Sequence, residues 1–137
     1  MMIRVLDASV AVAWYVNESF SPSARHWQTL LLDGKAAFII PSLHFWEVAN
    51  VLRTHVARKL LSAPIAQEIY RLHLDAPLET AEPERDRVLS MALERGMSAY
   101  DAVYATLAVE REIPWLTAER TTKPWHASLG KLVEALT

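Results

Sequence analysis

Short apolar runs that alternate with helix-like segments are the feature of this sequence that most restricts its fold. Each run is too short for a helix, and most are mainly apolar, which is typical of strands buried in a parallel sheet. The runs are residues 3–6, 37–40, 77–80 and 114–117, with residues 131–136 as a candidate fifth. This alternation predicts an α/β fold, a three-layer α/β/α sandwich with a mainly parallel, roughly five-stranded central sheet.

Residue types that favour helix ends delimit the segments between these runs. Four serines precede helix-like segments and are expected to cap them: Ser21, Ser42, Ser62 and Ser98. Gly34 and Gly96 favour helix C-termini, because glycine readily adopts the left-handed conformation found there. The predicted helices are residues 8–16, 22–33, 43–59, 63–74 and 84–95, and a further helix that follows Ser98.

The composition is that of a single globular domain over residues 1–137. Hydrophobic residues make up 52% of the chain and charged residues 22%, so a sizeable core is expected. The absence of cysteine excludes a disulfide scaffold and any Cys-based zinc site. The formal net charge is −2 with mixed signs along the chain, so no basic tail indicates nucleic-acid binding. Without a membrane-spanning run or signal-peptide layout, we expect a soluble, cytoplasmic protein with no membrane partner.

Three carboxylates stand alone in apolar blocks of the sequence: Asp7, Glu47 and Asp101. In the stretch SAYDAVYATLA, residues 98–108, Asp101 is the sole charged residue. An ionised carboxylate that enters a protein interior without a partner costs several kcal/mol. Some group must therefore compensate each of these charges.

The lone carboxylates fall on one edge of the expected sheet. Asp7 ends the first strand, and Glu119 closely follows the fourth. Glu47 and Asp101 lie near the starts of helices that run back from that edge, where parallel α/β sheets bind ligands. Two carboxylates 4 Å apart repel each other by about 4 kcal/mol at an effective dielectric constant near 20, and a divalent cation removes this repulsion. Oxygen-only ligands favour Mg²⁺ or Mn²⁺.

Four motifs together resemble the PIN domain, specifically the VapC-type ribonuclease toxins of prokaryotic toxin–antitoxin pairs. They are Asp7-Ala8-Ser9, Glu47-Val48-Ala49-Asn50, Tyr100-Asp101-Ala102 and Leu116-Thr117-Ala118-Glu119. The resemblance covers nearly the whole chain in order and spacing.

The resemblance implies a role for each matching residue. Asp7, Glu47 and Asp101 correspond to residues that hold Mg²⁺ or Mn²⁺ and are catalytic in the family. The hydroxyl of Ser9 and the amide of Asn50 correspond to groups that orient them. Thr117 matches a small hydroxyl residue that lines the pocket, and Glu119 matches a fourth acidic position that is usually Asp. The extra methylene of Glu119 favours water-mediated coordination.

The resemblance also implies an activity and partners. The activity is endonucleolytic cleavage of RNA, such as tRNA or rRNA, by metal-activated water. The partners are a second copy in a homodimer and a small VapB-type antitoxin, whose tail is expected in a groove between the second helix and residues 43–74. Arg120 and Lys123 are candidates for RNA binding through phosphate, and exposed salt bridges are their alternative.

Simpler interpretations remain open for each carboxylate. Asp7 and Asp101 can stabilise helix N-termini, Glu47 can pair with His44, and Glu119 can be a solvated surface residue. For Trp14 and Trp46, each on an apolar helix, we expect core positions.

Two other functions are weighed against the nuclease. One is a PIN-like binding module that cleaves nothing, which only the Glu119 departure favours. The other is a receiver-like phosphoryl-transfer domain, but the second and fourth strands lack the aspartate and lysine that it requires. A zinc hydrolase is disfavoured because the histidines lack zinc-ligand spacing.

Overall fold

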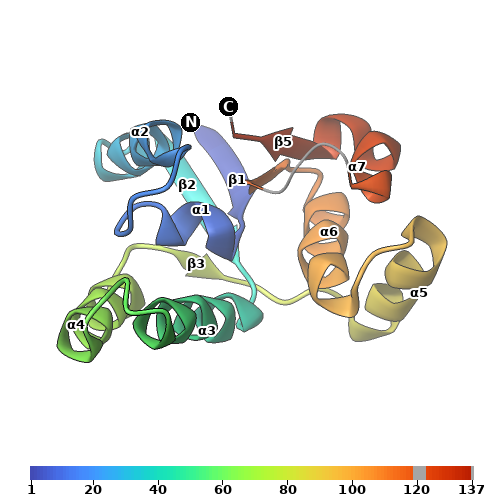
Figure 1. Ribbon diagram of the computed structural model, residues 1–137. Helices are drawn as coiled ribbons and strands as arrows, with labels where there is room; N and C mark the ends of the chain where they lie inside the picture. Colours follow the sequence, from blue (N-terminus) through green and yellow to red (C-terminus); the bar gives the residue numbers. More distant parts are fainter. Residues whose placement is uncertain (119–122, 137) are drawn as a thin grey trace.

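The computed structural model describes residues 1–118 and 123–136. Its strands form one sheet in the order β3-β2-β1-β4-β5, and every neighbouring pair is parallel. The strands are β1 (Met2–Leu6), β2 (Ala36–Ile40), β3 (Glu79–Thr80), β4 (Trp115–Thr117) and β5 (Val133–Ala135). The predicted α/β/α fold with a five-stranded parallel sheet is therefore confirmed (Figure 1).

Helices connect the strands and surround the sheet (Figure 1). They are α1 (Ala8–Val12), α2 (Ser21–Leu32), α3 (Leu43–Ala57), α4 (Ala63–Leu74), α5 (Arg85–Arg95), α6 (Ala99–Arg111) and α7 (Pro124–Leu129), with a 3₁₀ turn at Gly130–Leu132. Across residues 1–118 and 123–136, no helix has the length and apolarity needed to cross a membrane.

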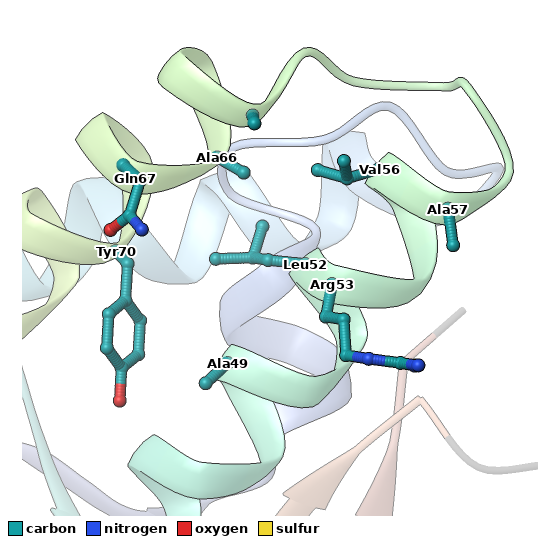
Figure 2. Close-up of a pocket in the computed structure, with 9 residues that line it drawn as sticks. Ala49, Leu52, Arg53, Val56, Ala57, Ala66, Gln67 and Tyr70 are labelled. Atoms are coloured by element: carbon teal, nitrogen blue, oxygen red, sulfur yellow. The ribbon is translucent and has the colours of Figure 1, made fainter.

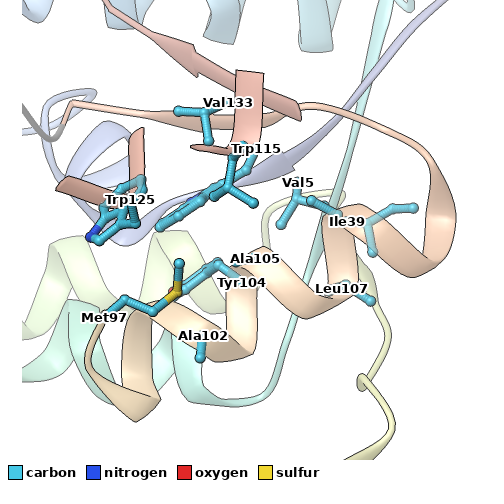
Figure 3. Close-up of a cluster of buried hydrophobic side chains, with 12 residues drawn as sticks. Val5, Ile39, Met97, Ala102, Tyr104, Ala105, Leu107, Trp115, Trp125 and Val133 are labelled. Atoms are coloured by element: carbon cyan, nitrogen blue, oxygen red, sulfur yellow. The ribbon is translucent and has the colours of Figure 1, made fainter. Parts of the chain in front are cut away.

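Alternate residues of the strands face two separate hydrophobic clusters, as the pleat of a strand requires. The cluster on the face covered by α6 and α7 contains Val5, Ile39, Trp115 and Val133 from the sheet (Figure 3). The cluster on the face covered by α1 and α2 contains Leu6, Phe38, Ile40 and Leu116. Both faces of the sheet are thus buried where these residues lie, which explains the consecutive apolar residues at 5–6, 38–40 and 115–116.

A third cluster joins α1 to the hairpin of α3 and α4. Val12 packs with Val48 and Leu52 of α3 and with Ile69 of α4. The hairpin thus rests on the helix that follows β1, and this contact sets the position of α3 relative to the end of β1.

The structure corrects several expected boundaries. The first helix ends at Val12 instead of residue 16, and β3 is reduced to Glu79–Thr80. The fifth strand is Val133–Ala135, because the 3₁₀ turn occupies the residues before it.

Two of the four predicted serine caps are confirmed. Ser62 Oγ accepts a hydrogen bond from the Ile65 amide, and Ser98 Oγ accepts one from the Asp101 amide. The prediction for Ser21 is wrong, and Ser42 stands at the predicted N-cap position of α3 without a side-chain cap.

The two remaining serines have other roles. Ser21 is already helical, and its hydroxyl binds the preceding loop, accepting from the Glu18 amide and donating to the Val16 carbonyl. Ser42 forms no side-chain cap, and its own amide donates to Glu82 Oε1.

The prediction of a core position holds for one tryptophan and fails for the other. Trp14 is buried, but Trp46 is 70% exposed. The buried residues of α3 are His44, Val48 and Leu52, which repeat every four residues along one face. Trp46 lies two residues after His44, about 200° around the helix, and therefore on the opposite face.

Candidate active site

Hydrogen bonds from Ser9 and Trp115 hold Asp7 at the carboxyl end of β1. Its Oδ2 accepts from the amide of Ser9 at 3.0 Å and from the Ser9 hydroxyl, and its Oδ1 accepts from the indole nitrogen of Trp115 at 3.1 Å. The carboxylate caps α1, as the simpler interpretation proposed. The Trp115 bond comes from a different strand, so capping explains only part of its environment.

Ser9 links Asp7 to the end of β4. Its hydroxyl accepts a hydrogen bond from the Ala118 amide at 3.1 Å while it donates to Asp7. Thr117, the last residue of β4, is fully buried beside this contact. The side chain of Ser9 thereby connects the carboxyl ends of β1 and β4.

Tyr104 of α6 brings Asp7 and Glu47 together. Its buried hydroxyl donates a hydrogen bond to Glu47 and accepts one from the backbone amide of Ala8, the residue after Asp7. Burial raises the pKa of Tyr104 well above its ordinary value, and the negative charges of Asp7 and Glu47 raise it further. The phenol therefore stays protonated and acts as a donor between the two acidic residues.

Aromatic stacking fixes the ring of Tyr104. Tyr104 lies parallel to Trp115, with ring centroids 5.7 Å apart, and Trp115 stacks in turn on Trp125 at 4.9 Å (Figure 3). Trp115 thus orients both Asp7, through its indole N–H, and Tyr104, through its ring face.

Asp101 occupies the first turn of α6, and its backbone amide binds Ser98 Oγ at 3.0 Å. It precedes Tyr104 by three residues, and positions three apart share a face of a helix. The half-buried Asp101 side chain thus lies on the same side of α6 as Tyr104.

Glu47 lies in the second turn of α3 and is half-buried. The alternative interpretation paired it with His44. Both ring nitrogens of His44 bind other groups, since Nδ1 lies 3.1 Å from the Leu6 carbonyl and Nε2 lies 2.8 Å from Nε2 of His73. The Tyr104 hydroxyl takes the place that the alternative gave to His44.

The two histidines belong to a buried chain of hydrogen bonds below the site. A carbonyl only accepts, so His44 donates from Nδ1 to Leu6, and its Nε2 accepts from His73 Nε2–H. His73 Nδ1 then accepts from the Tyr15 hydroxyl at 2.9 Å.

Burial keeps both rings of this chain neutral. It lowers the pKa of His73 to about 4, and burial together with the neighbouring His73 lowers the pKa of His44 to about 3. The neutral chain connects the end of β1, next to Asp7, with α3 and α4.

The remaining predicted residues are only partly described. Asn50 is exposed on α3, one turn beyond Glu47, and Lys123 is exposed where α7 begins. Glu119 and Arg120 lie outside the described residues. The roles assigned to these four residues stay predictions.

The arrangement suits a divalent cation in its donor chemistry. Asp7 and Glu47 carry carboxylate oxygens, the donor type that such an ion prefers, and they lie close enough for both charges to act on the Tyr104 hydroxyl. In residues 1–118 and 123–136, no three acidic or histidine side chains are grouped closely enough to hold a metal ion. The oxygen-only donor set matches Mg²⁺ or Mn²⁺, with water and substrate as further ligands.

A family model for the PIN domain matches residues 4–122. The chain belongs to the PIN-domain family. Because the chain is a PIN domain, the receiver-like alternative is excluded. A search of curated protein sequences finds no match.

Solved structures share the PIN fold over nearly the whole chain. PAE2754 from Pyrobaculum aerophilum superimposes with a TM-score of 0.74 at 22% identity, covering 96% of this chain and 83% of that one. VapBC2 from Rickettsia felis, bound to a promoter DNA fragment, gives 0.66 at 15%, covering 99% and 100%. Mycobacterium tuberculosis VapC20, a sarcin-ricin loop cleaving toxin, gives 0.65 at 12%, covering 96% of each.

This PIN domain also has an apolar groove between α3 and α4, with a volume of about 470 Å³ (Figure 2). Leu52, Val56 and Ala66 line it, with Arg53 and Tyr70 at its sides. It lies within residues 43–74, where a partner groove was predicted, but between the two hairpin helices instead of between the hairpin and α2.

Sequence reasoning missed the aromatic and histidine groups that organise the site. Trp115 and Tyr104 stand in apolar stretches of the sequence, where nothing local distinguishes them from ordinary core residues. The signal that could have identified Trp115 is its position inside a buried strand, because a buried indole N–H normally finds an acceptor. Tyr104 stands three residues after Asp101, so its hydroxyl was a candidate for the same face.

Proposed function

We propose that this protein is a metal-dependent endoribonuclease, the VapC-type toxin of a type II toxin–antitoxin pair. The observation that carries the proposal is the convergence of Asp7 and Glu47 on the Tyr104 hydroxyl at the carboxyl edge of a PIN sheet. Like-charged carboxylates repel each other, and a bound divalent cation compensates both.

In this proposal Asp7, Glu47 and Asp101 hold Mg²⁺ or Mn²⁺, and part of this binding runs through coordinated water, because no three acidic side chains of the described residues are grouped closely enough to bind one ion directly. Glu119 is a fourth, water-mediated participant. When bound, such an ion polarises a phosphoryl oxygen and lowers the pKa of a coordinated water.

The chain's own groups keep the site in shape. Ser9 and Trp115 hold the two oxygens of Asp7. Tyr104 keeps its proton and orients Glu47 by donating to it. His44 and His73 use their ring nitrogens within the buried chain, so we assign them no proton transfer.

We further propose RNA, such as tRNA or rRNA, as the substrate, in the cytoplasm. Ser9, Asn50 and Thr117 support the acidic residues, and Arg120 and Lys123 contact phosphate. The similarity in fold to a toxin that cleaves the sarcin-ricin loop supports this substrate class.

Two protein partners complete the proposal, a second copy of the chain and a VapB-type antitoxin. The fold is shared with a VapBC2 complex, and the apolar α3–α4 groove offers a place for the antitoxin's apolar side chains.

The test is cleavage of a mixed tRNA and rRNA preparation by the purified, antitoxin-free protein, with Mg²⁺ or Mn²⁺ and with EDTA. Asp101→Asn deletes one charge with little change of shape. Asp33→Asn makes the same change at an exposed carboxylate at the end of α2 and serves as the matched control. We expect cleavage that EDTA abolishes, that Asp33→Asn retains, and that Asp101→Asn lowers by more than about 100-fold.

The proposal is overturned if a folded Asp101→Asn protein cleaves as fast as the control, or if EDTA has no effect. Binding of RNA without any cleavage would favour the alternative of a PIN-like binding module.

A further inference from the structure

A second hollow lies close to the acidic residues, between the start of α3, the loop after β3, and the helices α5 and α6. Its volume is about 380 Å³, near the lower end of the range for small-molecule sites. Leu43, Val88 and Val103 give it an apolar lining. We name it the α5–α6 hollow.

The α5–α6 hollow borders the residues of the proposed active site along two helices. On α6, Tyr100 of the hollow immediately precedes Asp101. On α3, Leu43 of the hollow lies four residues before Glu47, and positions four apart are neighbours on a helix surface. When an RNA strand is held at the acidic residues, a nucleotide next to the bound one therefore lies beside the hollow.

Tyr100 forms a wall of the hollow that is suited to stacking. Its side chain is 65% exposed, and within the described part of the chain its ring and hydroxyl take part in none of the aromatic contacts or hydrogen bonds. Proteins recognise single-stranded RNA by stacking unpaired bases on such exposed aromatic rings.

Two charged side chains of opposite sign stand at the rim. Glu82 is fixed by a 2.7 Å hydrogen bond from the Ser42 amide to its Oε1. Arg85 lines the same hollow and is exposed, with no ion pair to any residue in the described ranges. The rim thus offers one acceptor and one multiple donor.

This combination fits the edge of a base better than a phosphate. A phosphate at Arg85 would also meet the negative charge of Glu82, whereas a base edge carries both donors and acceptors. Guanine matches the pair well, because its amino group donates and its O6 and N7 accept.

We propose that the α5–α6 hollow binds an unpaired base of the RNA, next to the cleaved bond, with guanine preferred. Tyr100 stacks on the base, Glu82 accepts from its amino edge, and Arg85 donates to its acceptors. This inference rests on the proposed ribonuclease function and adds a determinant of sequence preference to it.

The first test maps cleavage sites in RNAs with a randomised single-stranded loop. The wild-type protein is expected to prefer guanine at one position beside the cut. Tyr100→Leu should raise KM by about 5- to 150-fold, the range that loss of one base–aromatic stack implies. Tyr100→Phe keeps the ring and should keep KM near the wild-type value. Arg85→Gln should weaken the guanine preference at the same position. Arg71→Gln, which removes an exposed charge from α4, is the matched control for a general loss of positive charge.

The second test separates base binding from cleavage. Fluorescence anisotropy measures the affinity of Asp101→Asn protein for labelled single-stranded RNA with and without guanine, in the presence of Mn²⁺. A guanine preference that disappears in the Asp101→Asn, Arg85→Gln double variant supports the hollow, even if the wild-type protein cleaves nothing. The Asp101→Asn, Tyr100→Leu double variant should bind RNAs with and without guanine more weakly, because stacking on the ring does not depend on the base.

If the wild-type protein cleaves RNA and folded Tyr100→Leu and Arg85→Gln proteins keep its KM and base preference, the inference about the hollow is wrong and the nuclease proposal stands. Failure of the inference about the hollow is therefore distinguishable from failure of the nuclease proposal.

Discussion

The buried His44–His73 pair predicts that this protein loses stability in mild acid. Both rings are fully buried and linked at 2.8 Å, and burial lowers their pKa values to about 3 and about 4 from an ordinary value of 6.5. Between these values and 6.5 the unfolded chain binds two protons that the folded chain does not. Stability is therefore highest above pH 6.5 and falls as the pH drops through the interval below it.

The size of the stability loss follows from the difference between the pH and the ordinary pKa of histidine. At pH 5 each unfolded histidine is 1.5 pH units below its ordinary pKa of 6.5, and one unit corresponds to about 1.4 kcal/mol. Each ring therefore contributes a loss of about 2 kcal/mol, and the pair about 4 kcal/mol, relative to neutral pH. Domains of this size have total stabilities of about 5–15 kcal/mol, so the loss is large enough to measure.

The assay is urea denaturation at pH 7.5, 6 and 5. His73→Gln keeps a hydrogen-bonding side chain but cannot be protonated, so its loss between pH 7.5 and pH 5 should be smaller than that of the wild-type protein by about 2 kcal/mol. His26→Gln, at an exposed position on α2, should behave like the wild type. Equal losses in the wild-type and His73→Gln proteins would refute the reasoning, because the carboxylates common to both would then account for the whole effect.

Three further predictions concern single side chains. Trp115→Phe keeps most of the stacking but removes the indole N–H that binds Asp7, so urea denaturation should show a loss of about 1–3 kcal/mol; no change would mean that this hydrogen bond does not hold the carboxylate. Gly96→Ala places a side chain at a backbone φ of +63° and should lower the unfolding free energy by about 1 kcal/mol, and an unchanged midpoint would contradict the cap. Trp46→Ser should change stability by less than about 0.5 kcal/mol, because the ring is 70% exposed, whereas a loss of several kcal/mol would place it in the core.

The sheet and the location of the acidic residues were predictable because they depend on local patterns. Short apolar runs separated by capped helices permit few arrangements other than a parallel sheet with helices on both faces. In such a sheet, an aspartate that ends a strand and an aspartate that begins a helix face the same edge. The positions of Asp7 and Asp101 follow from this rule.

The contacts around these residues were not predictable, because they join distant parts of the chain. Trp115 donates a hydrogen bond to Asp7, which lies 108 residues away in the sequence. The hydrogen-bonded residues His44 and His73 are separated by 29 positions. No local spacing reports such pairs.

Trp46 shows a related limit of predicting burial from a sequence pattern. The helix that carries it is apolar on several sides, so composition did not identify the face that packs against α1. The face became clear only from the buried series His44, Val48 and Leu52.

The central claim is that Asp7, Glu47 and Asp101 hold a divalent metal ion. The most direct measurement is anomalous X-ray diffraction from crystals of the protein soaked in Mn²⁺. The account predicts an anomalous peak coordinated by carboxylate oxygens of Asp7 and Asp101, with Glu47 bound directly or through water. Crystals that diffract well and show Mn²⁺ only at other carboxylates, or none at this edge of the sheet, would contradict it.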